Sequence, residues 1–315
     1  MTDPRKETRA VLTGIVTILL TVFAMALTDA FVKFSSADMT LWQIYVCRSA
    51  IALPLLLLLG RGGVLPKAIG WVALRSLALV AMYLAIYAAI PLLDLSVIAA
   101  SLYTGPLFIV LLSAVFLHER VAPQQWLAVA LGFVGVLFVV RPNGADFTAL
   151  SLIPIIAALL YALVAVLTRA KCADETPASL AAGLNVGLIA FGGAASLWFW
   201  VSPSDHAETY PFLFGTWSSF GAGTIGILCV MAVLIVGVSI GLARAYQSPR
   251  PQIIATFDYA YLIFAAFWGF VFFREVPDVW TVAGIALIIA AGVLVLVRRP
   301  DAQASRLDKL PDTGT

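Results

Sequence analysis

Ten long apolar runs follow one another along this chain, and they constrain its fold more than any other feature. Each run holds roughly the 20 residues that a helix needs to cross the hydrocarbon core of a bilayer. The runs are apolar on every side, unlike the alternating strands of a membrane barrel. An all-α integral membrane protein is therefore predicted, with ten transmembrane helices near residues 10–32, 41–59, 70–90, 97–117, 124–140, 150–169, 178–200, 219–243, 252–273 and 279–297.

Composition and motifs exclude several other classes of protein. Only 11% of the 315 residues are charged, against roughly 25% in soluble domains. The net charge of +2 is too small to indicate nucleic-acid binding. The three cysteines have no metal-binding spacing, and no hydrolase, zinc-enzyme or nucleotide-binding motif occurs. We therefore expect neither an enzyme nor a bound cofactor.

The distribution of basic residues predicts the orientation in the membrane. Of the 19 Lys and Arg residues, 14 fall on one predicted side, three fall on the other, and Arg48 and Arg75 lie inside helices. Basic residues favour the cytoplasmic side. Both termini are therefore predicted to be cytoplasmic, in what we expect to be a bacterial inner membrane.

The two halves of the sequence resemble each other. Glu119 and Glu275 each close an apolar helix, and they are separated by 156 residues. The same shift relates Tyr103 to Tyr259, and the helices that follow both glutamates end alike. Each half holds five predicted helices, and an odd number inverts the second half in the membrane. Inverted repeats of this kind build secondary transporters that hold substrate where the halves meet.

These segments are similar to the two EamA repeats of the drug/metabolite transporter superfamily. The second copy is the stronger match, running from Phe257–Tyr259 through Phe273–Asp278 to Gly284–Ile288. In the first copy, Gly105–Phe108 lies ahead of Glu119 in the manner of the family. The predicted organisation is a cytoplasmic tail (1–9), a first EamA repeat (10–148), a second EamA repeat (149–298) and a second cytoplasmic tail (299–315).

The resemblance implies a carrier that works by alternating access. Family members export amino acids, other metabolites or drugs, and some take up S-adenosylmethionine, the branch that Asp29, Lys33 and Arg48 resemble. The predicted function is secondary active or facilitative transport of a small polar metabolite, an amino acid or a derivative. Two alternatives stay open: an S-adenosylmethionine uptake carrier, and an intramembrane enzyme or non-transporting membrane protein. The expected partners are this substrate and the lipid bilayer, with a coupling proton and the oligomeric state left open.

Charged residues within the apolar runs are candidates for the binding site or its gates, since they are costly in a bilayer. Asp29, Lys33 and Arg48 lie toward the outer side. Arg48 either anchors a substrate carboxylate or forms a structural ion pair with Asp29. Arg75 and Asp258 lie toward the cytoplasmic side. Asp258 either carries a coupling proton or forms a latch with Arg75 or Arg244.

Aromatic residues complete the predicted site. Tyr83 and Tyr87 share one helical face because they are four residues apart. Tyr103 and Tyr259 lie well inside their predicted helices rather than at the ends, where aromatic residues usually anchor a protein to the membrane interface. These four tyrosines are expected to line the cavity or to pack structurally.

Overall fold

The structure, a computed structural model, is helical throughout the part of the chain that it describes. That part contains no strand. Glu119 and the tail 299–315, for which the sequence made predictions, lie outside the described residues. The described residues are 4–59, 63, 65–116, 123–140, 149–246, 254 and 257–296.

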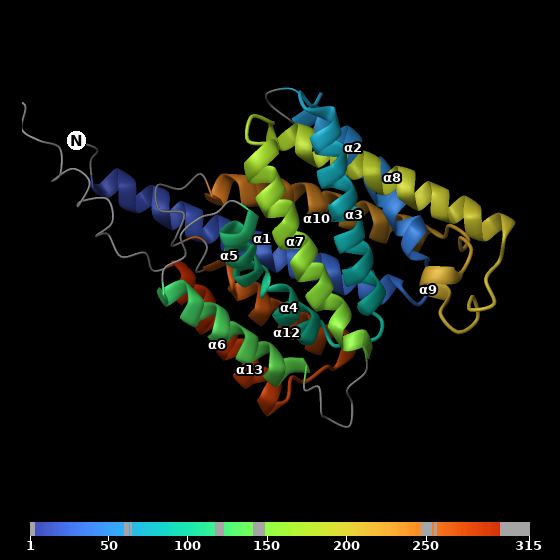
Figure 1. Ribbon diagram of the computed structural model, residues 1–315. Coiled ribbons are helices and arrows are strands. Elements are labelled where there is room, and N and C mark those ends of the chain that lie inside the picture. Colours follow the sequence, from blue (N-terminus) through green and yellow to red (C-terminus); the bar gives the residue numbers. More distant parts are fainter. Residues whose placement is uncertain are drawn as a thin grey trace, which may run out of the picture.

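The helices form a single bundle in which α1 is the longest element (Figure 1). Prolines at the first turn help to begin α7, α8 and α9, where a missing N–H is tolerated. The elements are α1 (Pro4–Ser35), α2 (Leu41–Leu59), α3 (Ile69–Ala89), α4 (Leu95–Leu102), α5 (Gly105–Phe116), α6 (Pro123–Val140), the 3-10 turn η1 (Ala149–Leu152), α7 (Ile153–Lys171), α8 (Pro177–Val201), α9 (Pro211–Phe214), α10 (Ala222–Tyr246), α12 (Ala260–Phe273) and α13 (Val279–Leu296).

Length and apolar composition make this an integral membrane protein. In the described part of the chain, eight helical segments are long and apolar enough to cross a bilayer, and α4 and α5 together count as one of them. The helices α12 and α13 are apolar but shorter. Large apolar side chains on the outer surface are exposed, such as Leu58 at 82% and Trp200 at 74%. The predicted all-helical membrane fold is confirmed.

The predicted helix 97–117 is not continuous. It divides into α4 and α5, with Tyr103 and Thr104 forming a turn between them. Pro106 explains the break, because proline has no N–H to donate to the carbonyl four residues earlier and its ring clashes with that carbonyl, whereas it is tolerated in the first turn of α5. The Thr104 hydroxyl donates to the Ser101 carbonyl at 2.6 Å, which satisfies a carbonyl freed by the break.

A second break lies at Tyr259, inside the predicted helix 252–273. Phe257 and Asp258 are helical, Tyr259 is a turn residue, and the helix resumes as α12 at Ala260. The two breaks therefore fall at the pair of tyrosines that the sequence shift of 156 relates.

Several helices pack against a helix that runs in the opposite direction. At one end of the α6–α13 pair, the Gln124 side-chain amide donates to the Leu294 carbonyl at 3.4 Å. At the other end, the rings of Phe138 and Trp280 lie 5.6 Å apart. The start of one helix thus meets the end of the other, and the pair lies side by side in Figure 1.

Glycine allows the α6–α13 pair to approach closely. A Cβ on Gly284 would lie 2.6 Å from the backbone oxygen of Gly135, and a Cβ on Gly135 would lie 2.9 Å from the oxygen of Gly284. Both obstacles are backbone atoms, which cannot rotate away. Small residues commonly permit such close contact between membrane helices.

Gly284→Ala is therefore expected to destabilise the protein by about 2 kcal/mol, the usual cost of overpacking. Thermal unfolding in detergent measures the effect. Gly226→Ala in α10 is the matched control, because a Cβ there meets no atom within 4 Å. Equal melting temperatures for the two variants would contradict the close approach of α6 and α13.

The other helix pairs surround the middle of the bundle. α2 packs on α8, and Trp42 near the start of α2 lies against Phe199 near the end of α8. The helix α1 packs on α10 and α12, while α7 packs on α3, α4 and α5. The two largest clusters of buried apolar side chains extend across helices from both halves of the chain.

Candidate functional site

The two helix breaks meet in the interior. The rings of Tyr103 and Tyr259 lie 5.3 Å apart in an edge-to-face contact. The Tyr103 hydroxyl donates to the backbone carbonyl of Asp258 at 3.1 Å, and its ring stacks on Tyr261 at 5.1 Å. Broken helices expose backbone polar groups at membrane depth, which is tolerated where they are buried in protein or line a cavity.

Asp29 of α1 lies beside this meeting point. The Tyr261 hydroxyl donates to one of its carboxylate oxygens at 2.6 Å. Both groups are deep in the bundle, yet Asp29 keeps some exposed surface. Asp29 was a candidate from the sequence, whereas its partner Tyr261 was not. The position of Tyr261, two residues after the matched Tyr259, is the sequence feature that could have identified it.

Arg48 of α2 is 2% exposed, and tyrosines surround its guanidinium. One of its nitrogens donates to the Tyr87 hydroxyl at 3.0 Å, and the guanidinium lies 5.6 Å from the centre of the Tyr87 ring. Tyr83 and Tyr45 also lie near the guanidinium. Such cation–π contact fixes the side chain in place.

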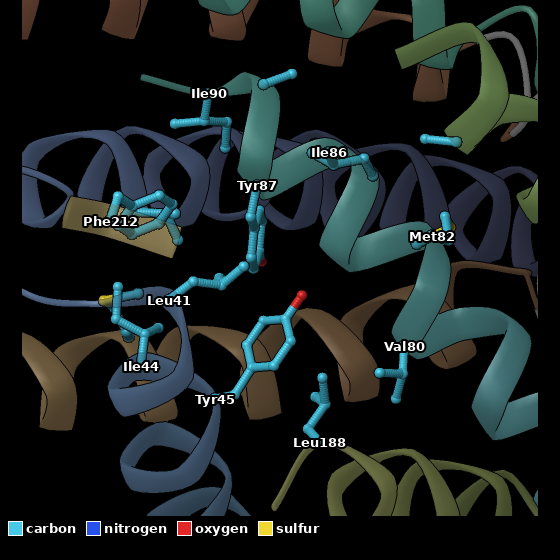
Figure 2. Close-up of a cluster of buried hydrophobic side chains, with 14 of the residues drawn as sticks. Leu41, Ile44, Tyr45, Val80, Met82, Ile86, Tyr87, Ile90, Leu188 and Phe212 are labelled. Carbon is cyan, nitrogen blue, oxygen red and sulfur yellow. The ribbon is translucent and has the colours of Figure 1, made fainter. Parts of the chain in front are cut away.

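Tyr45 adds a hydroxyl that sequence reasoning missed. Figure 2 shows Tyr45 and Tyr87 pointing into the space between α2 and α3. The Tyr45 side chain is fully buried, and its hydroxyl oxygen has no hydrogen-bond partner in the described structure. Tyr45 precedes Arg48 by three residues on the same face of α2, which is the spacing that could have identified it.

Lys33 forms a latch with Glu275, the residue that follows the left-handed end of α12. Its ammonium pairs with one carboxylate oxygen of Glu275 and donates to the Leu93 carbonyl at 2.7 Å. The other oxygen accepts from the Leu95 backbone N–H at 2.9 Å and so caps α4. We call Lys33, Glu275 and the start of α4 the charged latch. It connects α1, α4 and α12 at one end of the bundle.

Asp94 lies next to the charged latch, just before α4. Burial raises the pKa of the Asp94 carboxyl above its ordinary value of 3.8, and the neighbouring negative charge of Glu275 adds to the rise. Lys33 acts in the opposite direction. The sequence placed Glu275 at the end of its own apolar helix. In the structure its carboxylate caps the start of a different helix, α4.

The candidates on the other side are more dispersed. Arg75 of α3 donates to the Thr168 hydroxyl of α7 at 2.7 Å. Arg244 is exposed near the end of α10. Tyr161 of α7 lies within the electrostatic influence of Asp258, Tyr83 and Arg75 and is nevertheless 43% exposed. Tyr161 was not among the residues predicted from the sequence.

The structure thus gathers most of the predicted site residues and separates a few. Arg48, Tyr83 and Tyr87 form one group, while Asp29 adjoins the tyrosines of the helix breaks. Lys33 belongs to the charged latch instead. Among the described residues, no three His, Cys, Asp or Glu side chains cluster to hold a metal ion.

A separate contact fixes the turn between α7 and α8 to the start of α3. The Ala68 backbone N–H donates to Glu175 at 2.6 Å, and the Ser179 hydroxyl donates to its other oxygen at 2.9 Å. The hydrogen bond from Ala68 is the main cause that lowers the pKa of the Glu175 carboxyl below its usual 4.5.

A lowered native pKa contributes stability above the unfolded value, and this contribution is lost as pH falls through the native pKa. Glu175→Gln is therefore expected to lower the melting temperature at neutral pH, with the difference from wild type shrinking below pH 4.5. Thermal unfolding across this pH range measures the effect. Asp174→Asn, in the same turn, is the control. A difference that persists at the lowest pH would argue against the capping role.

Apolar helices around a centre of buried charges and tyrosines define an integral membrane protein with a polar interior. Residues 12–141 match the EamA-like transporter family. The riboflavin transporter of Brucella anthropi is 30% identical over 277 residues, which cover 86% of this chain and 90% of the relative. The chain belongs to the EamA-like transporter family, within the drug/metabolite transporter superfamily.

Other relatives carry different substrate names. The pseudopaline exporter of Pseudomonas aeruginosa is 30% identical, over 88% of this chain and 94% of its own length. The S-adenosylmethionine uptake transporter of Rickettsia prowazekii is 22% identical, over 64% and 63%. A solved protein crystal structure shares the fold with a TM-score of 0.53, at 19% identity over 96% of this chain and 99% of that one. These relatives are transporters, which supports a membrane transporter rather than an enzyme at the level of the family.

Proposed function

We propose that this protein is a secondary carrier of a small polar metabolite, an amino acid or a derivative, working by alternating access in a bacterial inner membrane. Both termini are cytoplasmic, as the distribution of basic residues predicts. The observation that carries the proposal is Arg48, a guanidinium held at 2% exposure among tyrosines in the middle of a membrane bundle. A charge in that place is costly unless it serves a substrate or a partner.

The proposal includes ten membrane helices in two inverted repeats, 10–148 and 149–298, flanked by the tails 1–9 and 299–315. Pairing α4 and α5 with α12 as fourth and ninth helices, the matched helices α2 and α8, α6 and α13, and α4 and α12 all contact each other. The first two pairs run antiparallel, as inversion requires. The α1–α10 contact also has its expected counterpart in α3–α7.

The roles assigned to the site follow from its geometry. Arg48 with Tyr83 and Tyr87 holds the substrate. The adjoining helix breaks at Tyr103 and Tyr259 serve as hinges between the two halves. The charged latch closes one end of the bundle, while Arg75 and Asp258 belong to the gate at the other. Asp258 remains the candidate for a coupling proton.

The relatives are named for three different substrates: riboflavin, pseudopaline and S-adenosylmethionine. An amino acid carries a carboxylate, which a buried guanidinium suits. S-adenosylmethionine combines an amino acid with a nucleoside, and the tyrosine rings around Arg48 would stack on its base. An S-adenosylmethionine-type carrier is therefore the second candidate.

Counterflow into proteoliposomes tests the proposal. Vesicles preloaded with a bacterial metabolite extract are expected to accumulate labelled amino acids or S-adenosylmethionine, and protein-free vesicles are not. Detection by mass spectrometry leaves the substrate open. If no solute of the extract crosses faster than in empty vesicles, the carrier function is disproved.

A further inference from the structure

Two opposite charges near the centre of the bundle are only partly satisfied. A guanidinium has five N–H donors. Within the described residues, Arg48 donates one side-chain hydrogen bond, to the Tyr87 hydroxyl. Asp29 accepts a hydrogen bond from Tyr261 at one oxygen, and no partner is found for the other oxygen among the same residues. Buried charges normally have more partners than this.

These two charges are also held apart. In the described structure Lys33 and Glu275 form an ion pair, whereas no nitrogen of Arg48 lies within 4.0 Å of an Asp29 oxygen. The structural ion pair that the sequence left open is thus not formed. Each charge still acts on its neighbours at longer range, since Arg48 influences Asp29. In place of each other, Arg48 has Tyr87 and Asp29 has Tyr261 as hydrogen-bond partner.

Two further tyrosines, Tyr45 and Tyr83, lie near these charges. The Tyr45 hydroxyl is fully buried without a partner, and it lies on the same face of α2 as Arg48. The Tyr83 side chain is partly exposed, and its hydroxyl lies within electrostatic range of both Arg48 and Asp29. Unpartnered buried polar atoms usually mark a place where a ligand or water completes the hydrogen bonding.

We propose that these residues bind a zwitterion, with Arg48 and the Tyr45 hydroxyl holding its carboxylate and Asp29 holding its ammonium group. The assignment rests on the proposed transport function and narrows its substrate to molecules with an α-amino acid head group. A carboxylate accepts two parallel bonds from a guanidinium. The ammonium donors match the carboxylate oxygen of Asp29 that has no partner.

Recognition of both poles makes the site selective. A ligand with only a carboxylate leaves Asp29 without a cation, and a ligand with only an amine leaves Arg48 without an anion. Leaving one buried charge unpaired is strongly unfavourable. The side chain of the substrate would lie beside Tyr83, which is close to both charges.

Matched ligands separate the two poles experimentally. Stabilisation of the purified full-length protein against heat reports binding. The probes are a panel of the protein amino acids, and L-phenylalanine and L-leucine are compared with analogues that lack one pole: phenylpropanoate and isocaproate, then phenylethylamine and isoamylamine. We expect at least one amino acid to bind, and to bind about tenfold or more tightly than either of its single-pole analogues.

Variants then assign each pole. Asp29→Asn is expected to weaken amino acid binding about tenfold and to leave binding of the acid analogue unchanged or stronger. Arg48→Gln is expected to weaken amino acid binding as well, and to leave binding of the amine analogue unchanged or stronger. Asp38→Asn, in the exposed turn after α1, is the control. If Asp29→Asn does not fold, Asp29→Glu preserves the charge, and the analogue comparison on wild type still decides.

Two results would overturn the assignment. One is binding of phenylpropanoate or phenylethylamine as tight as that of L-phenylalanine, or the same equality in the leucine series. The other is a failure of every amino acid to stabilise the protein. In either case, flux of another solute in the proteoliposome assay keeps the carrier function and removes only the zwitterion, whereas absence of all flux removes both.

Discussion

Arg48→Gln is expected to lower amino acid flux into proteoliposomes by about 100-fold at substrate concentrations below saturation. Glutamine keeps a side chain of similar length but removes the charge. Truncating one partner of a buried charge pair costs about 3 kcal/mol, and each 1.4 kcal/mol is about tenfold in affinity. Tyr87 also loses the donor that holds its hydroxyl.

Arg48→Lys separates charge from shape in the same assay. Lysine keeps the positive charge but cannot make the two-point contact of a guanidinium, so its flux should fall between wild type and Arg48→Gln. Arg9→Gln, an exposed arginine at the start of the first span, is the control and should behave as wild type. Wild-type flux in Arg48→Gln, at equal amounts of folded protein, would remove this residue from the binding site.

Loss of the Lys33 ammonium should produce the largest change in stability. Lys33 and Glu275 are 13% and 10% exposed, so Lys33→Met leaves a nearly buried carboxylate facing Asp94 without its cation. Breaking one partner of a buried pair costs about 3–5 kcal/mol. Thermal unfolding in detergent should therefore show a marked fall in melting temperature. Lys171→Met is the matched control, because Lys33 lies over the Phe273 ring and Lys171 lies over the Trp71 ring at the same distance of 5.2 Å.

A double variant distinguishes an ion pair from two independent effects. Lys33→Met combined with Glu275→Gln should be more stable than the sum of the two single losses predicts, since each single variant leaves one unpaired charge and the double variant leaves none. Opening of this end is measured separately. Ser35→Cys, at a position that is 1% exposed, should react faster with an impermeant maleimide once Lys33 is replaced. Additive losses and unchanged labelling would show that the charged latch closes nothing.

The helical membrane fold was predictable because apolar length in a bilayer leaves the backbone few alternatives. The breaks at Tyr103 and Tyr259 were not predicted, because hydropathy carries no information on local backbone geometry. Pro106 in the sequence could have indicated the first break. Most candidate charges were found by the same argument of cost in lipid. Their partners were not, since Tyr261 and Glu275 meet Asp29 and Lys33 across more than 200 residues of sequence.

Tyr45 shows a further limit of reading a sequence. On an apolar helix a tyrosine is most often a packing residue, and its hydroxyl gains meaning only when the fold leaves it buried beside Arg48. Tyr161 is similar, because its exposure depends on how α7 lies against α3 and α5. Residue type and spacing locate a charge, but three-dimensional packing decides which neutral groups complete its shell.

Gly269 holds a place in α12 where a side chain would touch the carboxylate of Glu275. Its carbonyl accepts a hydrogen bond from the Glu275 backbone N–H at 3.2 Å, and its lack of a side chain leaves the room in which that carboxylate rests. A cysteine at this position, alkylated with reagents of increasing size, would displace the Glu275 carboxylate by increasing amounts. The rate of the transport cycle could then be tuned chemically while every ionisable group of the protein stays in place.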